Sequence, residues 1–238
     1  MPTTYYYDPS AIYYYIFMLP GLIVVLWASY KVKSTFSRYS GVLNSRGLTG
    51  EGAAQAVLSA YNVWGVVFER VSGSLTDHYD PRKNVIRLSD DVFYSSSCAA
   101  IGVAAHEAGH AAQYSDGYFP IKVRMAVIPI CNIGSQLSIP LLVLGSIFAF
   151  RPLLVAGVAA FGVSLLFRLA TLPVEFNASR RALKVIREQG LLCGEEYEGA
   201  KKVLTAAAMT YVAGMLQSLL QLLYYIAMLA GSNRRNRR

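Results

Sequence analysis

Two histidines and a glutamate are spaced for metal chemistry in the stretch AAIGVAAHEAGHAAQ, residues 99–113. On a helix, residues four apart share a face, so His106 and His110 can offer two imidazoles to one cation. Glu107 can hold a metal-bound water and remove its proton, which is how an HExxH helix hydrolyses amides. We therefore predict one catalytic Zn²⁺ ion at this helix. The alternative is a pair of core histidines on an alanine-rich helix.

A catalytic zinc ion normally has three protein ligands, so a third residue must join the two histidines. Asp116 lies where the HExxHxxGxxH pattern places its last ligand, but Gln113 occupies the position that needs a glycine turn. Glu175, in LPVEFNASRRAL, follows an apolar run, and Pro173 suits the first turn of a helix that would begin there. Two membrane spans between His110 and Glu175 would return this carboxylate to the side of the histidines. We favour Glu175 over Asp116.

The composition indicates a membrane protein. Hydrophobic residues make up 54% of the 238-residue chain and charged residues only 15%, which is unlike an ordinary soluble domain. The net charge is +8, but the basic residues flank apolar segments. We interpret them as topology signals and lipid contacts, and expect no nucleic-acid partner. Three cysteines without CxxC spacing are expected to be packing residues: Cys98, Cys131 and Cys193.

The zinc-site elements are expected in a segment at the membrane surface. Thr49 is a plausible N-cap, residues 65–71 read as a strand, and residues 78–89 as a hairpin that turns at 80–84. Ser95, Ser96 and Ser97 offer an N-cap for the HExxH helix. The apolar run 99–112 is too short to span a bilayer, so we expect this helix at the membrane and not within it.

Four apolar runs are long enough to span a membrane. Basic residues after the first run place its C-terminal end in the cytoplasm by the positive-inside rule, and the tyrosines at 5–7 and 13–15 suit a membrane interface. A simple count of four spans would then put the arginine-rich tail outside, a conflict that stays open. The expected segments are a transmembrane helix at 11–30, a cytoplasmic-side catalytic segment at 31–120, a transmembrane hairpin at 121–172, a third-ligand helical segment at 173–203, a fourth transmembrane helix at 205–230 and a basic tail at 231–238.

Three blocks of the chain resemble one family. The helix AIGVAAHEAGHAAQ, the hairpin LTDHYDPRKNVIRLSDDVF and the block LPVEFNASRRAL are similar to the YugP-type membrane zinc metallopeptidases, bacterial relatives of the HtpX-like gluzincins. The resemblance implies that His106, His110 and Glu175 bind zinc, with Glu107 as general base. HtpX-like enzymes commonly carry an acid four residues after the ligand glutamate. Ser179 stands there in this chain, with Asn177 close by, and either could support a zinc histidine.

Further residues could assist the reaction. His78 could donate to the oxyanion, although a histidine before a turn is more often on the surface. Arg180 and Arg181 could stabilise the tetrahedral intermediate or bind a substrate carboxylate, or could be surface charges. Gluzincin sites usually lie under an edge strand that binds the substrate backbone. The candidate strand, which could equally be an ordinary sheet strand, is Asn84, Val85, Ile86, Arg87 and Leu88.

The expected fold is an α+β membrane protein, mainly helical, with about four transmembrane helices and a small gluzincin-like zinc domain with a short β-sheet. The expected function is a membrane-anchored zinc endopeptidase of a bacterial plasma membrane, with its site on the cytoplasmic side. Its expected partners are polypeptide substrates in or near the bilayer, the lipids, and a possible membrane-protein partner or oligomer. The alternatives are an intramembrane protease and a zinc-stabilised scaffold without proteolysis.

Overall fold

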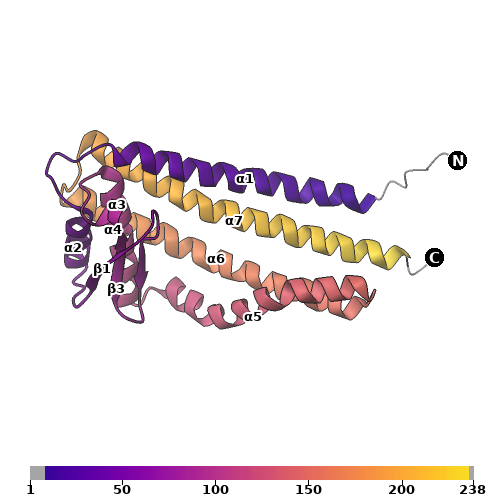
Figure 1. Ribbon diagram of the computed structural model, residues 1–238. Helices are drawn as coiled ribbons and strands as arrows, with labels where there is room; N and C mark the ends of the chain where they lie inside the picture. The colour runs from indigo at the N-terminus through magenta and orange to yellow at the C-terminus, as the bar shows by residue number, and fades with distance from the viewer. Residues whose placement is uncertain (1–8, 236–238) are drawn as a thin grey trace. The chain divides into compact units, whose positions relative to one another are not determined.

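The computed structural model describes residues 9–235. Over this range the chain is mainly helical with one small sheet, as predicted (Figure 1). The predicted tyrosines at 5–7 lie outside the described residues, as do the last three residues of the predicted tail. The helices are α1 (Pro9–Ser40), α2 (Gly50–Ala60), α3 (Asp90–Phe93), α4 (Cys98–Ser115), α5 (Phe119–Ile147), α6 (Arg151–Glu188) and α7 (Gly194–Arg235), and the strands are β1 (Val67–Val71), β2 (His78–Asp80) and β3 (Val85–Ser89).

Four helices of the described chain are long and apolar enough to cross a membrane. They lie at Ile12–Ser40, Phe119–Ile147, Arg151–Glu188 and Gly194–Ala230, so the predicted number of spans is confirmed by length and composition. The HExxH helix α4 is not among them. Three of the candidate spans, in α1, α6 and α7, belong to helices longer than the apolar runs alone predict.

The helix expected to begin near Pro173 does not begin there. Pro173 lies inside α6, which continues without a break from Arg151 to Glu188. A proline in a helix interior removes one backbone hydrogen bond. Here the neighbouring Val174 and Ala178 are fully buried, so packing of this part of α6 overrides the local preference for a helix start.

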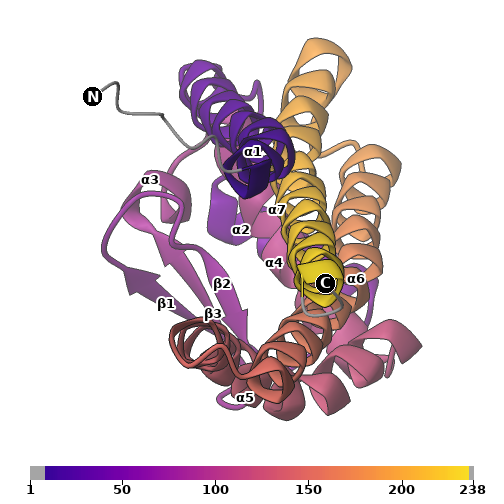
Figure 2. The same cartoon turned by 90° about the vertical axis from the view of Figure 1, so that its right-hand side faces the viewer.

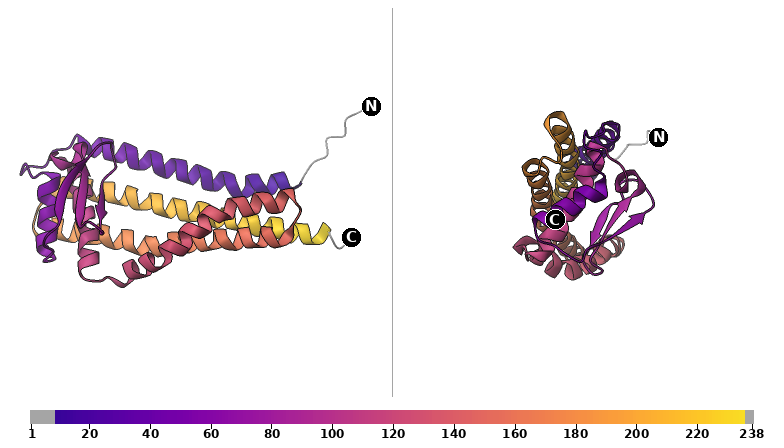
Figure 3. Two further views of the ribbon diagram at one scale, coloured as in Figure 1. Left: turned by 60° about the horizontal axis from the view of Figure 1, so that its bottom comes forward. Right: turned by 90° about the vertical axis from the view of Figure 1, so that its left-hand side faces the viewer.

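The chain forms two compact units. The first consists of residues 1–27, 125–169 and 212–238, and its described part contains only helical segments and the turn between α5 and α6. These segments run alongside one another (Figure 3). Tyr14 of α1 contacts Tyr224 of α7, Phe161 of α6 contacts Tyr225, and the Cys131 thiol of α5 lies 3.2 Å from the backbone oxygen of Val163 in α6.

The second unit, residues 28–124 and 170–211, contains the three-stranded sheet and α4. The strand order is β1-β3-β2 (Figure 2), with β1 parallel and β2 antiparallel to β3. The β2–β3 pair is the predicted hairpin. Tyr79 pairs with Ile86, and Asn84 adopts a left-handed conformation in the turn, with φ of 54°.

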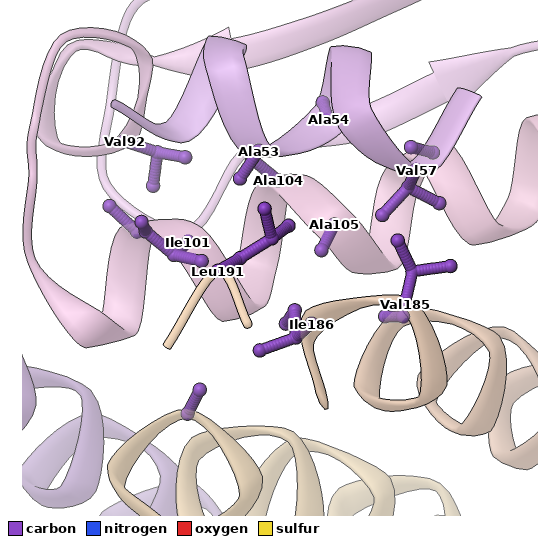
Figure 4. Packing of buried hydrophobic residues seen from close by; sticks show 14 of the residues in the cluster. Ala53, Ala54, Val57, Val92, Ile101, Ala104, Ala105, Val185, Ile186 and Leu191 are labelled. Atoms are coloured by element: carbon purple, nitrogen blue, oxygen red, sulfur yellow. The ribbon is translucent and has the colours of Figure 1, made fainter. Parts of the chain in front are cut away.

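The core of this second unit surrounds α4. Ile101, Ala104 and Ala105 of α4 are fully buried, and they pack with α2 on one side and with α6 and Leu191 on the other (Figure 4). The Ser97 hydroxyl accepts the Ala100 N–H at the start of α4, and the Thr49 hydroxyl accepts the Gly52 N–H at the start of α2. Both predicted N-caps are therefore present, and small side chains let α4 lie deep among its neighbours.

Candidate metal centre

Three side chains bring possible metal-binding atoms together in the second unit. His106 and His110 come from α4 and Glu175 from α6, and their ligand atoms lie within 4.8 Å of one another. This is the set of ligands that the sequence favoured. Within residues 9–235, no other group of three or more histidine, cysteine, aspartate or glutamate side chains has this geometry.

The donor atoms fit a tetrahedral zinc site. Glu175 Oε2 lies 3.4 Å from His106 Nε2 and 3.5 Å from His110 Nε2. Ligands about 2.1 Å from a tetrahedral Zn²⁺ ion are separated by about 3.4 Å. Glu175 Oε2 is also buried without a hydrogen-bond partner, an arrangement that is costly unless a cation satisfies the oxygen. Two imidazoles and a carboxylate therefore fit zinc and leave a fourth position for water.

The electrostatics of the centre favour positive charge. Burial of the His110 imidazole lowers its pKa, but the adjacent Glu175 carboxylate and the charge of Glu107 outweigh that effect. The pKa of His110 is therefore raised above its ordinary value. The same carboxylates that attract a proton to this ring would attract a divalent cation in its place.

Each histidine has an outer partner for its second ring nitrogen. The Ser179 hydroxyl lies 3.0 Å from His106 Nδ1, and Gln113 Oε1 lies 3.0 Å from His110 Nδ1. An Nδ1–H that donates to such an oxygen leaves Nε2 free to bind a metal and holds the ring in place. Ser179, named from the sequence as a possible support, contacts His106.

Gln113 also connects the two helices that carry the ligands. Its side chain is fully buried, and its amide nitrogen donates to the Val174 carbonyl at 2.8 Å and to Asn177 Oδ1 at 2.9 Å. Asn177 Oδ1 also accepts from Arg181 Nε at 2.7 Å. Asn177 therefore supports the His110 side of the centre through Gln113.

Asp116, the competing third ligand, lies elsewhere. Its Oδ2 accepts from Arg181 Nη1 at 2.6 Å, and it is absent from the metal-binding group found among the described residues. The Arg181 guanidinium is held by this ion pair and stacks over the rings of Tyr61 and Tyr118. Arg181 therefore ties the end of α4 to α6.

Glu107 faces a small cavity at the centre. The cavity has a volume of about 240 Å³, and its walls include His106, Glu107, Glu175 and Tyr211. Glu107 Oε2 accepts the backbone N–H of Tyr79 in β2 at 3.0 Å. This bond fixes one oxygen of the carboxylate and leaves the other for a water molecule.

Gly109, inside the HExxH motif, permits the close approach of α4 to α6. A Cβ atom at this position would lie 2.6 Å from the Ala178 carbonyl oxygen, closer than two such atoms can pack. Since Ala178 lies one turn after Glu175, this contact brings the Glu175 carboxylate toward the histidines.

The substrate strand predicted at Asn84–Leu88 is wrong as an edge strand. These residues form β3, whose backbone pairs with β1 on one side and with β2 on the other from Val85 to Arg87. No free backbone edge remains there for a peptide. The edge beside Glu107 is β2 instead.

His78 and Arg180 lie away from the metal-binding atoms. His78 is exposed on β2, with Nδ1 2.8 Å from the Thr76 carbonyl oxygen. Arg180 is exposed and lines a second cavity. Neither lines the cavity that contains Glu107.

The sequence did not identify four residues that surround the centre. Gln113 was three residues after His110, a helical spacing that could have indicated its contact. No sequence pattern around Tyr211 or Arg124 indicated a place at the centre. Arg124 Nη1 lies 3.4 Å from Glu175 Oε1. Asp77 lines the cavity, and its carboxylate accepts the Ser89 N–H at 2.7 Å.

Comparisons with known proteins agree with this geometry. Residues 14–230 match the protein family described as "Putative neutral zinc metallopeptidase". The chain is 43% identical over 214 residues to "Putative membrane protease YugP" of Bacillus subtilis (strain 168), an alignment that covers 89% of this chain and 95% of that protein. No solved structure matches the chain. The family match spans most of the chain and includes all three metal-binding residues, so the chain belongs to this zinc metallopeptidase family.

Proposed function

We propose that the protein is a membrane-embedded zinc endopeptidase of the gluzincin type, in which His106, His110 and Glu175 hold one zinc ion. The observation that carries the proposal is the convergence of these three donors, two of which, His106 and Glu175, line the same cavity as Glu107. The family and its membrane protease relative support the same reaction class.

Glu107 is the general base of the proposed reaction. Zn²⁺, when bound, supplies a Lewis acid that polarises water and the scissile carbonyl. Glu107 takes the proton from the attacking water through the oxygen that Tyr79 leaves free, and passes it to the leaving amine. Ser179 and Gln113 hold the imidazoles while the charge in the cavity changes.

Tyr211 is the proposed hydrogen-bond donor to the oxyanion. It lines the cavity with His106 and Glu107, and its phenol interacts with Glu175. A neutral phenol at this place can donate to the oxygen on which negative charge develops. His78 and Arg181 do not line this cavity, so Tyr211 takes the role for which they were candidates.

Replacing Glu107 with Gln tests the enzymatic reading against a zinc-stabilised scaffold. The amide keeps the shape and the Tyr79 contact but cannot accept the proton. We expect Glu107→Gln to bind zinc as wild type does and to lose proteolysis of a casein-type substrate in detergent. Equal proteolysis by wild type and variant would overturn the role of Glu107, and zinc bound without proteolysis by the wild type would favour the scaffold.

Zinc content tests the third ligand. Glu175→Ala removes the carboxylate that faces both histidines, so the purified variant should lose most of its zinc. Asp116→Ala is the matched control, because it removes an acid that pairs with Arg181 outside the centre. Full zinc occupancy in Glu175→Ala would refute the assignment.

The site is proposed to face the cytoplasm and to act on polypeptides in or near the bilayer. The basic residues that follow the first apolar run support this orientation. The absence of α4 from the candidate spans of the described chain supports a site outside the hydrocarbon core over an intramembrane one.

Cys193 offers a native reporter of the orientation. It is exposed in the unit that carries the metal centre, whereas Cys98 and Cys131 are buried. A membrane-impermeant maleimide should label wild-type protein in inside-out vesicles and not in right-side-out vesicles, with Cys193→Ser as the control. The reverse pattern would place the site on the outer side.

A further inference from the structure

A second cavity lies between α6 and α7 in the same unit as the metal centre. Its volume is about 530 Å³, within the range typical of ligand-binding sites. Its α6 wall includes Phe176, Leu183 and Arg187, and its α7 wall includes Leu204 and Ala208. The spacings along each helix are those of one helical face, so the cavity is a groove between two faces and not a chance gap.

This groove shares walls with the cavity of the metal centre. Ser179 and Ala208 line both cavities. The Ser179 hydroxyl is the group that lies 3.0 Å from His106 Nδ1. The groove and the metal cavity are therefore separated by one residue of each helix.

The two cavities differ in the charged side chains that line them. The metal cavity is lined by the acids Asp77, Glu107 and Glu175, and Glu175 pairs with Arg124. The groove is lined by Arg180, Lys184 and Arg187, against a single acid.

The basic groups of the groove are not neutralised by the protein. Among the ion pairs of the described chain, none includes Arg180, Lys184 or Arg187. The Arg187 guanidinium lies over the Tyr197 ring, 4.8 Å from its centre, a contact that orients it without cancelling its charge. Three cations beside the apolar side chains Phe176 and Leu183 favour binding of an anionic group that is attached to aliphatic carbons.

We propose that this groove, the basic groove, is a substrate subsite that binds an acidic segment of the polypeptide near the scissile bond. The inference rests on the proposed peptidase function and names its substrate class, polypeptides with Asp or Glu a few residues from the cleaved bond. A lipid phosphate would share the charge, but the wall that the groove shares with the metal centre favours the polypeptide.

Paired peptides test the proposal with the full-length protein in nanodiscs. Two fluorogenic peptides would differ only by Glu or Gln at the positions two to four residues on either side of the cleaved bond. We expect wild type to cleave the Glu peptide with a kcat/KM about tenfold higher, and added salt to reduce the difference. Equal values for the two peptides would overturn the subsite.

The double variant Arg180→Gln with Lys184→Gln isolates the groove. It should cleave both peptides at the rate of the Gln peptide in wild type, with unchanged zinc content. Lys201→Gln is the matched control, because Lys201 is exposed on α7 and lines neither cavity. A preference that persists in the double variant would refute the assignment.

Two further measurements separate the other outcomes. The first is binding of both peptides to Glu107→Gln protein, measured by fluorescence anisotropy. It detects the charge preference even if wild type cleaves neither peptide. Failure of the subsite can therefore be distinguished from failure of the peptidase function. If the double variant loses co-purified phosphatidylglycerol and keeps the peptide preference, the groove binds lipid and the proposal is wrong.

Discussion

Gln113 Oε1 lies 3.0 Å from the His110 Nδ1 atom, and the same side chain donates to the Val174 carbonyl beside Glu175. One buried amide therefore links His110, a proposed ligand on α4, to the helix that carries Glu175, the proposed third ligand. Gln113→Ala should weaken zinc binding by about 10- to 100-fold, measured by competition with a chromophoric chelator. Gln113→Glu, which keeps an acceptor for the ring N–H, should recover part of the loss. Equal zinc affinity in wild type and Gln113→Ala would show that the contact does not position His110.

Gly109 and Gly102 provide a matched pair on one helix. A Cβ at Gly109 would lie 2.6 Å from the Ala178 oxygen, whereas a Cβ at Gly102 would lie 3.4 Å from Ala200. Gly109→Ala should force α4 and α6 apart and lower both the melting temperature and the zinc occupancy. Gly102→Ala should change neither strongly. Similar zinc occupancy in the two variants would contradict the close approach.

Tyr211→Phe removes a single hydroxyl from the cavity. If the phenol donates to the oxyanion, kcat should fall by about 10²- to 10³-fold, while KM and zinc content stay near the wild-type values. A rise in KM at constant kcat would instead indicate that Tyr211 binds the substrate. Tyr224→Phe, in the other unit, is the control.

Asp77 predicts a pH dependence of stability. Burial raises the pKa of Asp77, the hydrogen bonds from Ser89 lower it, and the charge of Glu107 raises it further, with a net rise. The folded state then binds more protons than the unfolded state between the two pKa values, so stability falls as the pH rises through that window. Asp77→Asn should melt at a higher temperature than wild type near neutral pH.

The advantage of Asp77→Asn should shrink as the pH falls through the raised pKa of folded Asp77, and it should vanish below about 4, where Asp77 becomes protonated in the unfolded state as well. Thermal melts in detergent at several pH values measure this difference. Asp91→Asn, at an exposed position of α3, controls for the loss of one charge. A difference that grows on acidification would contradict the assignment.

The local pattern of the sequence accounts for part of the site. A spacing of four residues on a helix was enough to place His106 and His110 on one face, and the turn residues after Asp80 were enough to predict the hairpin. The prediction of Glu175 rested on two further arguments. A catalytic zinc ion needs a third ligand, and two membrane spans after His110 return the chain to the side of the histidines. These inferences depend on helix geometry and on chemistry, which a short stretch of sequence specifies.

The remaining features depend on long-range packing. Residues 85–89 would have the same sequence pattern whether β3 lay at an edge or in the centre of the sheet. The pairing with β1 makes β3 the central strand. Pro173 signalled a helix start, but burial of its neighbours keeps it inside α6. Tyr211 belongs to a long apolar helix, and only the folded chain brings it to the metal centre.

The placement of Glu175 on α6 determines when, during synthesis of the chain, all three proposed ligands are present. The ribosome completes α4, with both histidines, before it makes α5 and the part of α6 that precedes Glu175. A nascent chain up to that point has two of the three proposed ligands, and a catalytic zinc ion normally needs three. In the proposed enzyme, hydrolysis can therefore begin only after the second half of the chain has been made.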